Sequence, residues 1–294
     1  MKGDSSSNPS APRKCYPFPM PDLVDQLPSA LHAAARWKRL GLSKIPAMLV
    51  HPDWEQGLPV PVVIWMHGRT VNKELDPGRY LRWLRSGIGV CAVDLPGHGE
   101  RYDEAWQAPG RALDVVLQML NEIDEITESL DGMECFDSGR VGIGGMSAGG
   151  MVTLARLCRE HSFVCASVEA TSGSWGEHLR RNRSDTIPPD PPDSSDFPVL
   201  SEKIAAIDPI RNLDSWREIP IQALHSIHDE WVAIAGQERF FEALRDRYVE
   251  PGQIEFIRFE RTGAPYEHAG FGKYAAEAKN RQVDFLRRYL LDQS

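Results

Sequence analysis

The sequence predicts an α/β fold in which a mostly parallel central sheet is flanked by helices. Short apolar runs of strand length alternate along the chain with longer segments of helical periodicity, as in parallel sheets built from strand–helix units. The runs are apolar at nearly every position, which indicates strands that are buried on both faces. At 294 residues the chain is long enough for one large core, so we expect a single domain.

Each element follows from its local pattern. The apolar runs that we expect to form the parallel part of the sheet are residues 62–68, 89–95, 140–146, 163–170, 221–227 and 254–260. An earlier run, residues 47–52, is expected to pair with residues 36–40 in an antiparallel hairpin. The clearest helix has its apolar residues on one face and should end near Asp131-Gly132. These apolar residues are Leu113, Val116, Leu117, Leu120 and Ile123.

Two segments depart from the strand–helix rhythm. Residues 1–15 are rich in Ser, Pro and Asn and are expected to lack fixed structure, which leaves residues 16–294 as the folded domain. Residues 171–219 contain "RRNRSDTIPPDPPDSSDFP", which is too polar and too rich in proline to be one crossover helix. We therefore expect residues 171–219 to form a short, lid-like insertion above the sheet.

Composition excludes several classes of protein. The 33 basic and 42 acidic residues give a net charge of −9, the wrong sign for a protein that neutralises phosphates, so we expect no nucleic-acid partner. The N-terminus lacks the apolar core of a signal peptide, and no run of 18 apolar residues occurs, so we expect a cytoplasmic protein without a membrane partner. The five cysteines form no CxxC pair and are expected to be reduced packing residues. We expect no metal and no cofactor, and the oligomeric state stays open.

A single serine stands in a glycine-rich turn, "GMSAG" at residues 145–149, between an expected strand and an expected helix. A sharp strand-to-helix turn strains the residue at its apex, and side chains two positions to either side would collide, so Gly145 and Gly149 fit the geometry. The helix that follows has an apolar face of Met151, Leu154, Ala155 and Cys158. Ser147 is therefore expected to project its hydroxyl above the carboxyl edge of the sheet as a nucleophile.

A serine nucleophile needs a base that is oriented by a carboxylate, and both must come from loops at the same edge of the sheet. In the expected chain order of serine, acid and histidine, Asp229 follows the strand at 221–227 and His268 follows the last strand. Glu230 is the alternative acid. The sequence thus predicts a triad of Ser147, Asp229 and His268.

Five blocks of the sequence carry a family resemblance. They are "HG" at residues 67–68, "DLPGHGE" at 94–100, the turn at 145–149, "HSIHDEWV" at 225–232 and "EHAGF" at 267–271. With these blocks the chain resembles the α/β-hydrolase superfamily over roughly residues 47–291, and more closely its esterases and its dienelactone-hydrolase-like and prolyl-oligopeptidase-like catalytic domains. The resemblance implies the α/β-hydrolase fold and makes Asp229 the triad acid, although Ser226 stands where such families usually have glycine.

The resemblance also implies an oxyanion hole of two backbone N–H groups that hold the charged oxygen of the tetrahedral intermediate. Ala148 follows the nucleophile and should supply one donor. Arg69 follows the "HG" block and is the candidate for the other, with Gly68, also a candidate for substrate binding, as the near alternative. The side chain of Arg69 is expected to face solvent or to form a salt bridge, and an acidic substrate is a weaker possibility for it.

Further side chains near the expected site are weighed individually. Trp175 and Trp231 are candidates for the wall of a substrate pocket. His98 is expected to be structural. Glu169, at the end of a strand, is expected to cap a turn or to pair with an arginine of the insertion, Arg180, Arg181 or Arg183.

The function expected from these residues is hydrolysis of a small-molecule carboxylic ester through an acyl-enzyme intermediate. The insertion has few apolar residues with which to bury a long acyl chain, so short acyl groups are expected to be preferred. One alternative is an amide- or peptide-cleaving hydrolase with the same triad. Another is a non-catalytic member of the fold that binds a small molecule or a protein.

Overall fold

The computed structural model describes residues 24–175 and 202–292. Two expectations concern residues outside these ranges. Residues 1–15, expected to lack fixed structure, and residues 176–201 of the expected lid-like insertion lie outside the described residues.

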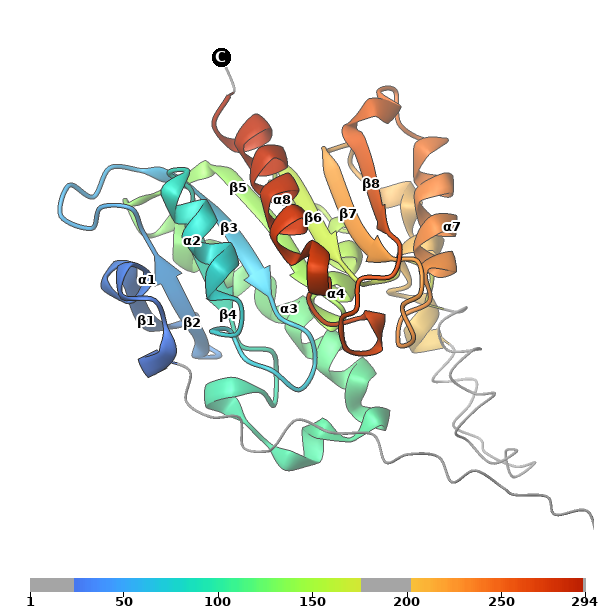
Figure 1. Cartoon of the computed structure of the whole chain (residues 1–294), viewed down its shortest axis with the longest axis horizontal. Helices are drawn as coiled ribbons and strands as arrows, with labels where there is room; N and C mark the ends of the chain where they lie inside the picture. The colour runs from blue at the N-terminus through green and yellow to red at the C-terminus, as the bar shows by residue number, and fades with distance from the viewer. Residues whose placement is uncertain (1–23, 176–201, 293–294) are drawn as a thin grey trace, which may run out of the picture.

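In the described part of the chain, eight strands form one sheet in the order β1-β2-β4-β3-β5-β6-β7-β8 (Figure 1). Their bounds are β1 Ala35–Leu40, β2 Ile45–Val50, β3 Val60–Met66, β4 Gly89–Val93, β5 Phe136–Met146, β6 Cys165–Glu169, β7 Ile221–Ser226 and β8 Ile254–Phe259. Strand β2 is antiparallel to β1 and to β4, and every other neighbouring pair is parallel. The mostly parallel sheet and the N-terminal antiparallel hairpin are both confirmed.

Helices cover both faces of this sheet. Helices α2 (Pro77–Arg85) and α8 (Ala275–Leu290) pack together on one face, and α3 (Ala112–Asp131) and α4 (Ala148–Leu157) pack together on the other (Figure 1). Helix α7 (Ile234–Arg245) contributes Phe240, Phe241 and Leu244 to the core on the α3–α4 side. A short helix, α1 (Ser29–Ala34), precedes the sheet. The result is a three-layer α/β fold.

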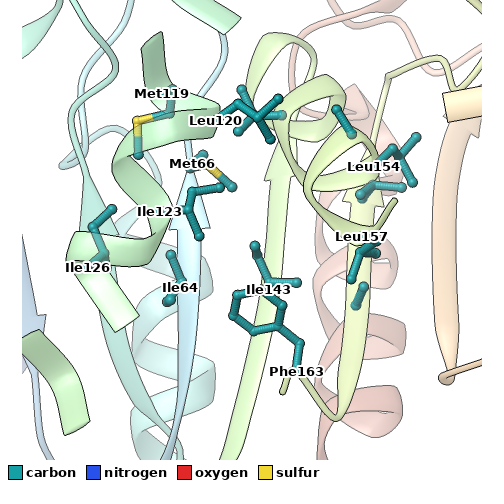
Figure 2. Packing of buried hydrophobic residues seen from close by; sticks show 14 of the residues in the cluster. Ile64, Met66, Met119, Leu120, Ile123, Ile126, Ile143, Leu154, Leu157 and Phe163 are labelled. Atoms are coloured by element: carbon teal, nitrogen blue, oxygen red, sulfur yellow. The ribbon is translucent and has the colours of Figure 1, made fainter. Parts of the chain in front are cut away.

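Strand β3 shows why the strand sequences are apolar throughout. Ile64 and Met66 face α3 and α4 in one core (Figure 2), whereas Val63 and Trp65 lie in the other core with α2 and α8. All four side chains are at most 3% exposed. A strand with a helix layer on each face has no solvent side, so it shows no alternation of polar and apolar residues.

Helix α3 ends at Asp131 with Gly132 at its C-cap, as the sequence predicts. Its buried surface is wider than the predicted face, because Met119 and Ile126 are also buried while Leu113 and Leu117 are only partly buried. The helix packs on the sheet and on α4 at the same time, and contact with two partners requires a broader apolar surface.

No helix in the described residues combines the length and the apolar character needed to cross a membrane.

Candidate active site

Ser147 lies in the sharp turn between β5 and α4. Its backbone angles, φ 52° and ψ −114°, belong to a region that residues with a side chain rarely adopt. A Cβ atom on Gly145 would overlap the backbone of Gly149, and one on Gly149 would overlap the carbonyl group of Met66. The two glycines are therefore required by the close approach of the strand, the turn and the helix.

The end of strand β6 holds this turn in place. The N–H of Ser147 donates to the carbonyl oxygen of Glu169 at 2.8 Å, and the hydroxyl of Thr171 donates to the carbonyl oxygen of Ser147 at 2.9 Å. The segment at the end of β6 thus holds the backbone on both sides of the Ser147 Cα. These two hydrogen bonds keep the turn in its strained conformation.

The side chain of Glu169 is paired beneath the turn with Arg79 of helix α2. The two guanidinium nitrogens lie 2.6 and 2.8 Å from its carboxylate oxygens, and both side chains are buried. Arg79 also contacts Asp76 and Gln282 and lies over the ring of Trp65. Glu169 is expected from the sequence to cap a turn or to pair with Arg180, Arg181 or Arg183, and these three arginines lie outside the described residues. In the described part of the chain its carboxylate pairs instead with Arg79 of helix α2.

His268 and Asp229 meet at the ends of adjacent strands. Nδ1 of His268 lies 2.8 Å from Oδ2 of Asp229, and both side chains are buried. A carboxylate at this distance accepts a hydrogen bond from Nδ1–H, which leaves Nε2 unprotonated and able to take a proton from a nucleophile. Glu230, the alternative acid, is exposed and donates its backbone N–H to Tyr266. The structure therefore brings Asp229 to the histidine.

Asp229 is held as an anion. Its Oδ1 accepts the backbone N–H groups of Trp231 and Val232, at 2.9 and 2.7 Å. Burial by itself would raise the pKa of Asp229, but hydrogen bonds from His225 and His268 outweigh burial and lower the pKa to about 2. Nε2 of His225 also bonds the carbonyl oxygen of Val232 at 2.8 Å.

A second carboxylate organises the turn that carries His268. Oε2 of Glu267 accepts hydrogen bonds from the N–H and the hydroxyl of Thr262 and from the hydroxyl of Ser226, and Oε1 accepts the N–H of Gly263. The bond from the N–H of Thr262 is the main cause that lowers the pKa of Glu267 to about 2. The backbone of Tyr266 and of Glu267 has positive φ, so this carboxylate stabilises a strained turn directly before the histidine.

Sequence reasoning gave Glu267 no role, although it lies in the quoted "EHAGF" block. Ser226, the one departure from the usual family pattern, could have pointed to it, because a hydroxyl in place of glycine at a strand end needs a partner. In the structure that partner is Glu267, at 2.9 Å.

The loop proposed to complete the oxyanion hole runs beside Ser147. A Cβ added to Gly68 would lie 3.4 Å from Cβ of Ser147, and Ala148 is the first residue of α4. His67 fixes the loop: its Nε2 accepts the N–H of Leu95 at 3.0 Å, so its Nδ1 carries the proton and donates to the carbonyl oxygen of Gly68. The backbone N–H groups of Arg69 and Ala148 remain the candidate donors.

The side chain of Arg69 differs from its expectation. Its Nη2 donates to the carbonyl oxygens of Trp106 and Ala108, at 2.9 and 3.0 Å, and burial lowers its pKa. Arg69 is neither free in solvent nor bridged to a carboxylate of the described residues, because residues 104–111 fold back over it and present carbonyl groups. His98 is buried and donates to the carbonyl oxygen of Pro96, which fits a structural role.

The two candidate pocket tryptophans have different surroundings. Trp175 is 4% exposed, packs in the main core and donates its indole N–H to the carbonyl oxygen of Ser172. A side chain with so little free surface serves as a core residue, which corrects its expected place in the pocket wall. Trp231 is 42% exposed, and its ring centroid lies 5.0 Å from that of His268.

The "DLPGHGE" block has a structural role that the sequence did not show. Nζ of Lys73 lies 2.9 Å from Asp94 and 2.7 Å from Glu100, and it also contacts Glu74. Lys73 and Asp94 are buried, so this network ties the loop after β3 to the loop after β4. In the described residues, no group of three or more His, Cys, Asp or Glu side chains is arranged to hold a metal ion.

Comparison with known proteins adds a family and named relatives. The sequence matches the prolyl oligopeptidase family over residues 79–293. Esterase YjfP of Escherichia coli (strain K12) is 22% identical over 85% of this chain and 97% of its own length. YitV of Bacillus subtilis (strain 168), named as a candidate esterase, is 26% identical over 74% of this chain and 87% of its own length.

The fold is also that of solved structures in this group. A puromycin-hydrolysing peptidase of Mycobacterium tuberculosis matches with a TM-score of 0.68 at 20% identity over 89% of this chain, which spans 41% of that peptidase. TT1662 of Thermus thermophilus matches with a TM-score of 0.66 at 21% identity over 88% of this chain and 99% of its own length. These likenesses establish the α/β-hydrolase fold.

The buried pair beneath the turn yields a stability prediction. Glu169→Ala leaves the guanidinium of Arg79 buried without its main partner, and we expect the free energy of unfolding to fall by about 3–5 kcal/mol. Chemical denaturation measures the change. The matched control is Glu277→Ala, which breaks the exposed pair with Arg281 and should cost less than about 1 kcal/mol. Equal small losses in the two variants would contradict the analysis.

Asp229 yields a prediction about acid stability. Its folded pKa of about 2 lies below the value of about 3.9 for an unfolded aspartate, so its contribution is present above about pH 4 and is lost as the pH falls towards 2. From about pH 5 to about pH 3, we expect the free energy of unfolding to fall by about 1 kcal/mol more in the natural protein than in Asp229→Asn. If the free energy of unfolding falls equally with pH in the two proteins, Asp229 is not held as an anion.

Glu267 yields a prediction about activity. In Glu267→Gln, either orientation of the amide places an NH₂ group against an N–H donor, so the turn before His268 should shift. A displacement of a base by about 1 Å can lower the rate by roughly a hundredfold, so we expect kcat for p-nitrophenyl acetate to fall by about tenfold to a hundredfold with little change in KM. Exposed Glu260→Gln is the control, and a natural kcat in Glu267→Gln would reject the positioning role.

Proposed function

We propose that this chain, which belongs to the prolyl oligopeptidase family and is a serine hydrolase, is an esterase that uses Ser147, His268 and Asp229 as its catalytic triad. The observation that carries the proposal is the pairing of His268 with Asp229 at 2.8 Å, in loops at the same edge of the sheet as the strained turn of Ser147. Their chain order is serine, acid and histidine, as in other enzymes of this fold.

The proposed reaction has two steps that share one base. The hydroxyl oxygen of Ser147 attacks the ester carbonyl carbon while Nε2 of His268 takes its proton, and the same imidazolium then protonates the departing alcohol. This leaves an acyl group on Ser147. A water molecule, deprotonated by His268, attacks the acyl carbon, and the proton returns to Ser147 as the carboxylic acid leaves.

Two charges develop in these steps, one on the oxygen of the tetrahedral intermediate and one on the imidazole, and we propose a stabilising group for each. The anionic oxygen of the tetrahedral intermediate is held by the N–H groups of Ala148 and Arg69, and removing one such donor typically costs about 3–4 kcal/mol of transition-state stabilisation. The imidazolium is stabilised by the ionised carboxylate of Asp229. Asp229 stays charged because it accepts hydrogen bonds from two backbone N–H groups in addition to those from histidine.

The comparisons support an ester as the bond that is cleaved. The relatives named as esterases match this chain over 87% and 97% of their length, so nearly all of each relative corresponds to this chain. The M. tuberculosis peptidase is more than twice the length of the region it shares with this chain. Because the same triad cleaves amides, an amide-cleaving hydrolase remains the alternative.

The preference for short acyl groups is part of the proposal and rests on the composition of residues 171–219. Each methylene of an acyl chain that the enzyme buries would contribute about 0.8 kcal/mol to binding, and this segment offers few apolar side chains for that purpose.

The test is a substrate panel combined with active-site labelling. We expect the protein to react with a fluorophosphonate probe at Ser147, to hydrolyse p-nitrophenyl acetate and butyrate faster than the dodecanoate, and to cleave aminoacyl p-nitroanilides more slowly still. Ser147→Ala should lose labelling and turnover but keep its melting temperature, because removal of this hydroxyl leaves no cavity in the core.

Each other result identifies a different alternative. Faster cleavage of the anilides would favour the amide-cleaving hydrolase, and labelling that persists in Ser147→Ala would reject the nucleophile. A protein that neither reacts with the probe nor turns over any substrate would be the non-catalytic member of the fold. A rate that rises steadily from acetate to dodecanoate would reject the short-chain preference.

A further inference from the structure

Two aromatic side chains from different loops stack beside the proposed catalytic histidine. The ring centroids of Trp231 and Tyr266 lie 4.9 Å apart with an angle of 26° between the ring planes, and the centroid of Trp231 lies 5.0 Å from that of His268. Trp231 follows the triad acid and Tyr266 precedes the triad base. We call this pair, Trp231 and Tyr266, the aromatic shelf.

The aromatic shelf is tied to the triad through its backbone. The N–H of Trp231 donates to the carboxylate of Asp229, and the N–H of Glu230 donates to the carbonyl oxygen of Tyr266 at 3.0 Å. The two loops are therefore joined both by main-chain bonds and by the ring stack. A ligand that touches the aromatic shelf would lie at a fixed distance from the base.

Tyr266 occupies its place at a conformational cost. Its φ of 55° is unfavourable for a side chain of this size, and the adjacent Glu267, with φ 52°, is held by hydrogen bonds from two other segments. Trp231 meanwhile leaves 42% of its surface open, although most other large aromatic side chains of the described residues are buried or half-buried. Backbone strain that presents an exposed ring beside a catalytic base is the kind of arrangement found at ligand sites.

From this geometry we propose that the aromatic shelf binds a flat, unsaturated ring of the ester substrate, which would make the natural substrate an aryl-bearing ester. This inference rests on the proposed esterase function. The ring belongs to the acyl part or to the alcohol part, because both lie near the histidine when the ester carbonyl is at Ser147. An offset stack on tryptophan favours a flat ring over a puckered ring of the same carbon count.

The experiment compares esters that differ only in the flatness of one ring. Benzyl acetate and cyclohexylmethyl acetate differ on the alcohol side, and ethyl phenylacetate and ethyl cyclohexylacetate differ on the acyl side. Within each pair the reacting ester group has the same substitution and the apolar surface is similar, so the ratio of kcat/KM values isolates ring recognition from general hydrophobic binding. We expect the natural protein to prefer the flat ring in at least one pair.

Variants then assign that preference to the aromatic shelf. Trp231→Leu keeps an apolar side chain and the backbone N–H, and should lower the flat-ring preference by about 3- to 10-fold, since ring pairs are worth roughly 0.5–1.5 kcal/mol. Tyr266→Leu should lower it in the same direction, and Trp231→Phe, which restores a ring, should retain most of it. Val249→Ala removes an exposed apolar side chain before β8, at the opposite edge of the sheet, and is the matched control.

The outcomes separate this inference from the proposed function. If the natural protein hydrolyses the esters without preferring the flat ring in either pair, the aromatic shelf is not a ring-binding site, although the esterase proposal stands. If Trp231→Leu lowers kcat/KM equally for both members of each pair, the side chain only positions the loop, and the inference is overturned. If no ester is hydrolysed and Ser147 is not labelled, the esterase proposal itself fails.

Discussion

The strained backbone of Ser147 is the constraint on which the rest of the site depends. A positive φ at a residue with a side chain persists only where its surroundings hold it, and here a strand, a helix and a neighbouring loop all approach within contact distance of the turn. That approach requires glycine at positions 145 and 149. As a consequence, the hydroxyl of Ser147 lies above the carboxyl edge of a parallel sheet, where loops from several strands can reach it.

Carboxylates, most of them buried, hold these loops in place around the turn. Glu169 fixes its own strand end through Arg79, Asp94 gathers the loops after β3 and β4 through Lys73, and Asp229 and Glu267 accept N–H groups from the loops after β7 and β8. A loop has no ladder of backbone bonds, and an ionised acceptor that takes several N–H groups supplies the missing order. Charged side chains around the proposed active site thus hold a small number of polar atoms in fixed positions.

The fold of this chain also occurs in a peptidase, and its sequence is similar to proteins named as esterases. The proposed triad and the candidate oxyanion donors lie at the edge of a sheet whose fold this chain shares with a peptidase of 20% identity. What differs between members of such a fold is the surface presented next to the histidine and the nucleophile. In this protein that surface includes a stacked tryptophan and tyrosine, which do not contribute to the core.

Sequence alone determined the strands, the longest helix and the strand-to-helix turn, because each depends on patterns within about twenty neighbouring residues. It also placed Asp229 and His268 at strand ends, and these ends meet in any parallel sheet with this strand order. Only the tertiary structure decided that Glu169 pairs with Arg79, that Arg69 binds carbonyl groups, and that Trp175 belongs to the core. Such partners lie tens of residues apart in the chain, so their pairing follows from how the layers pack.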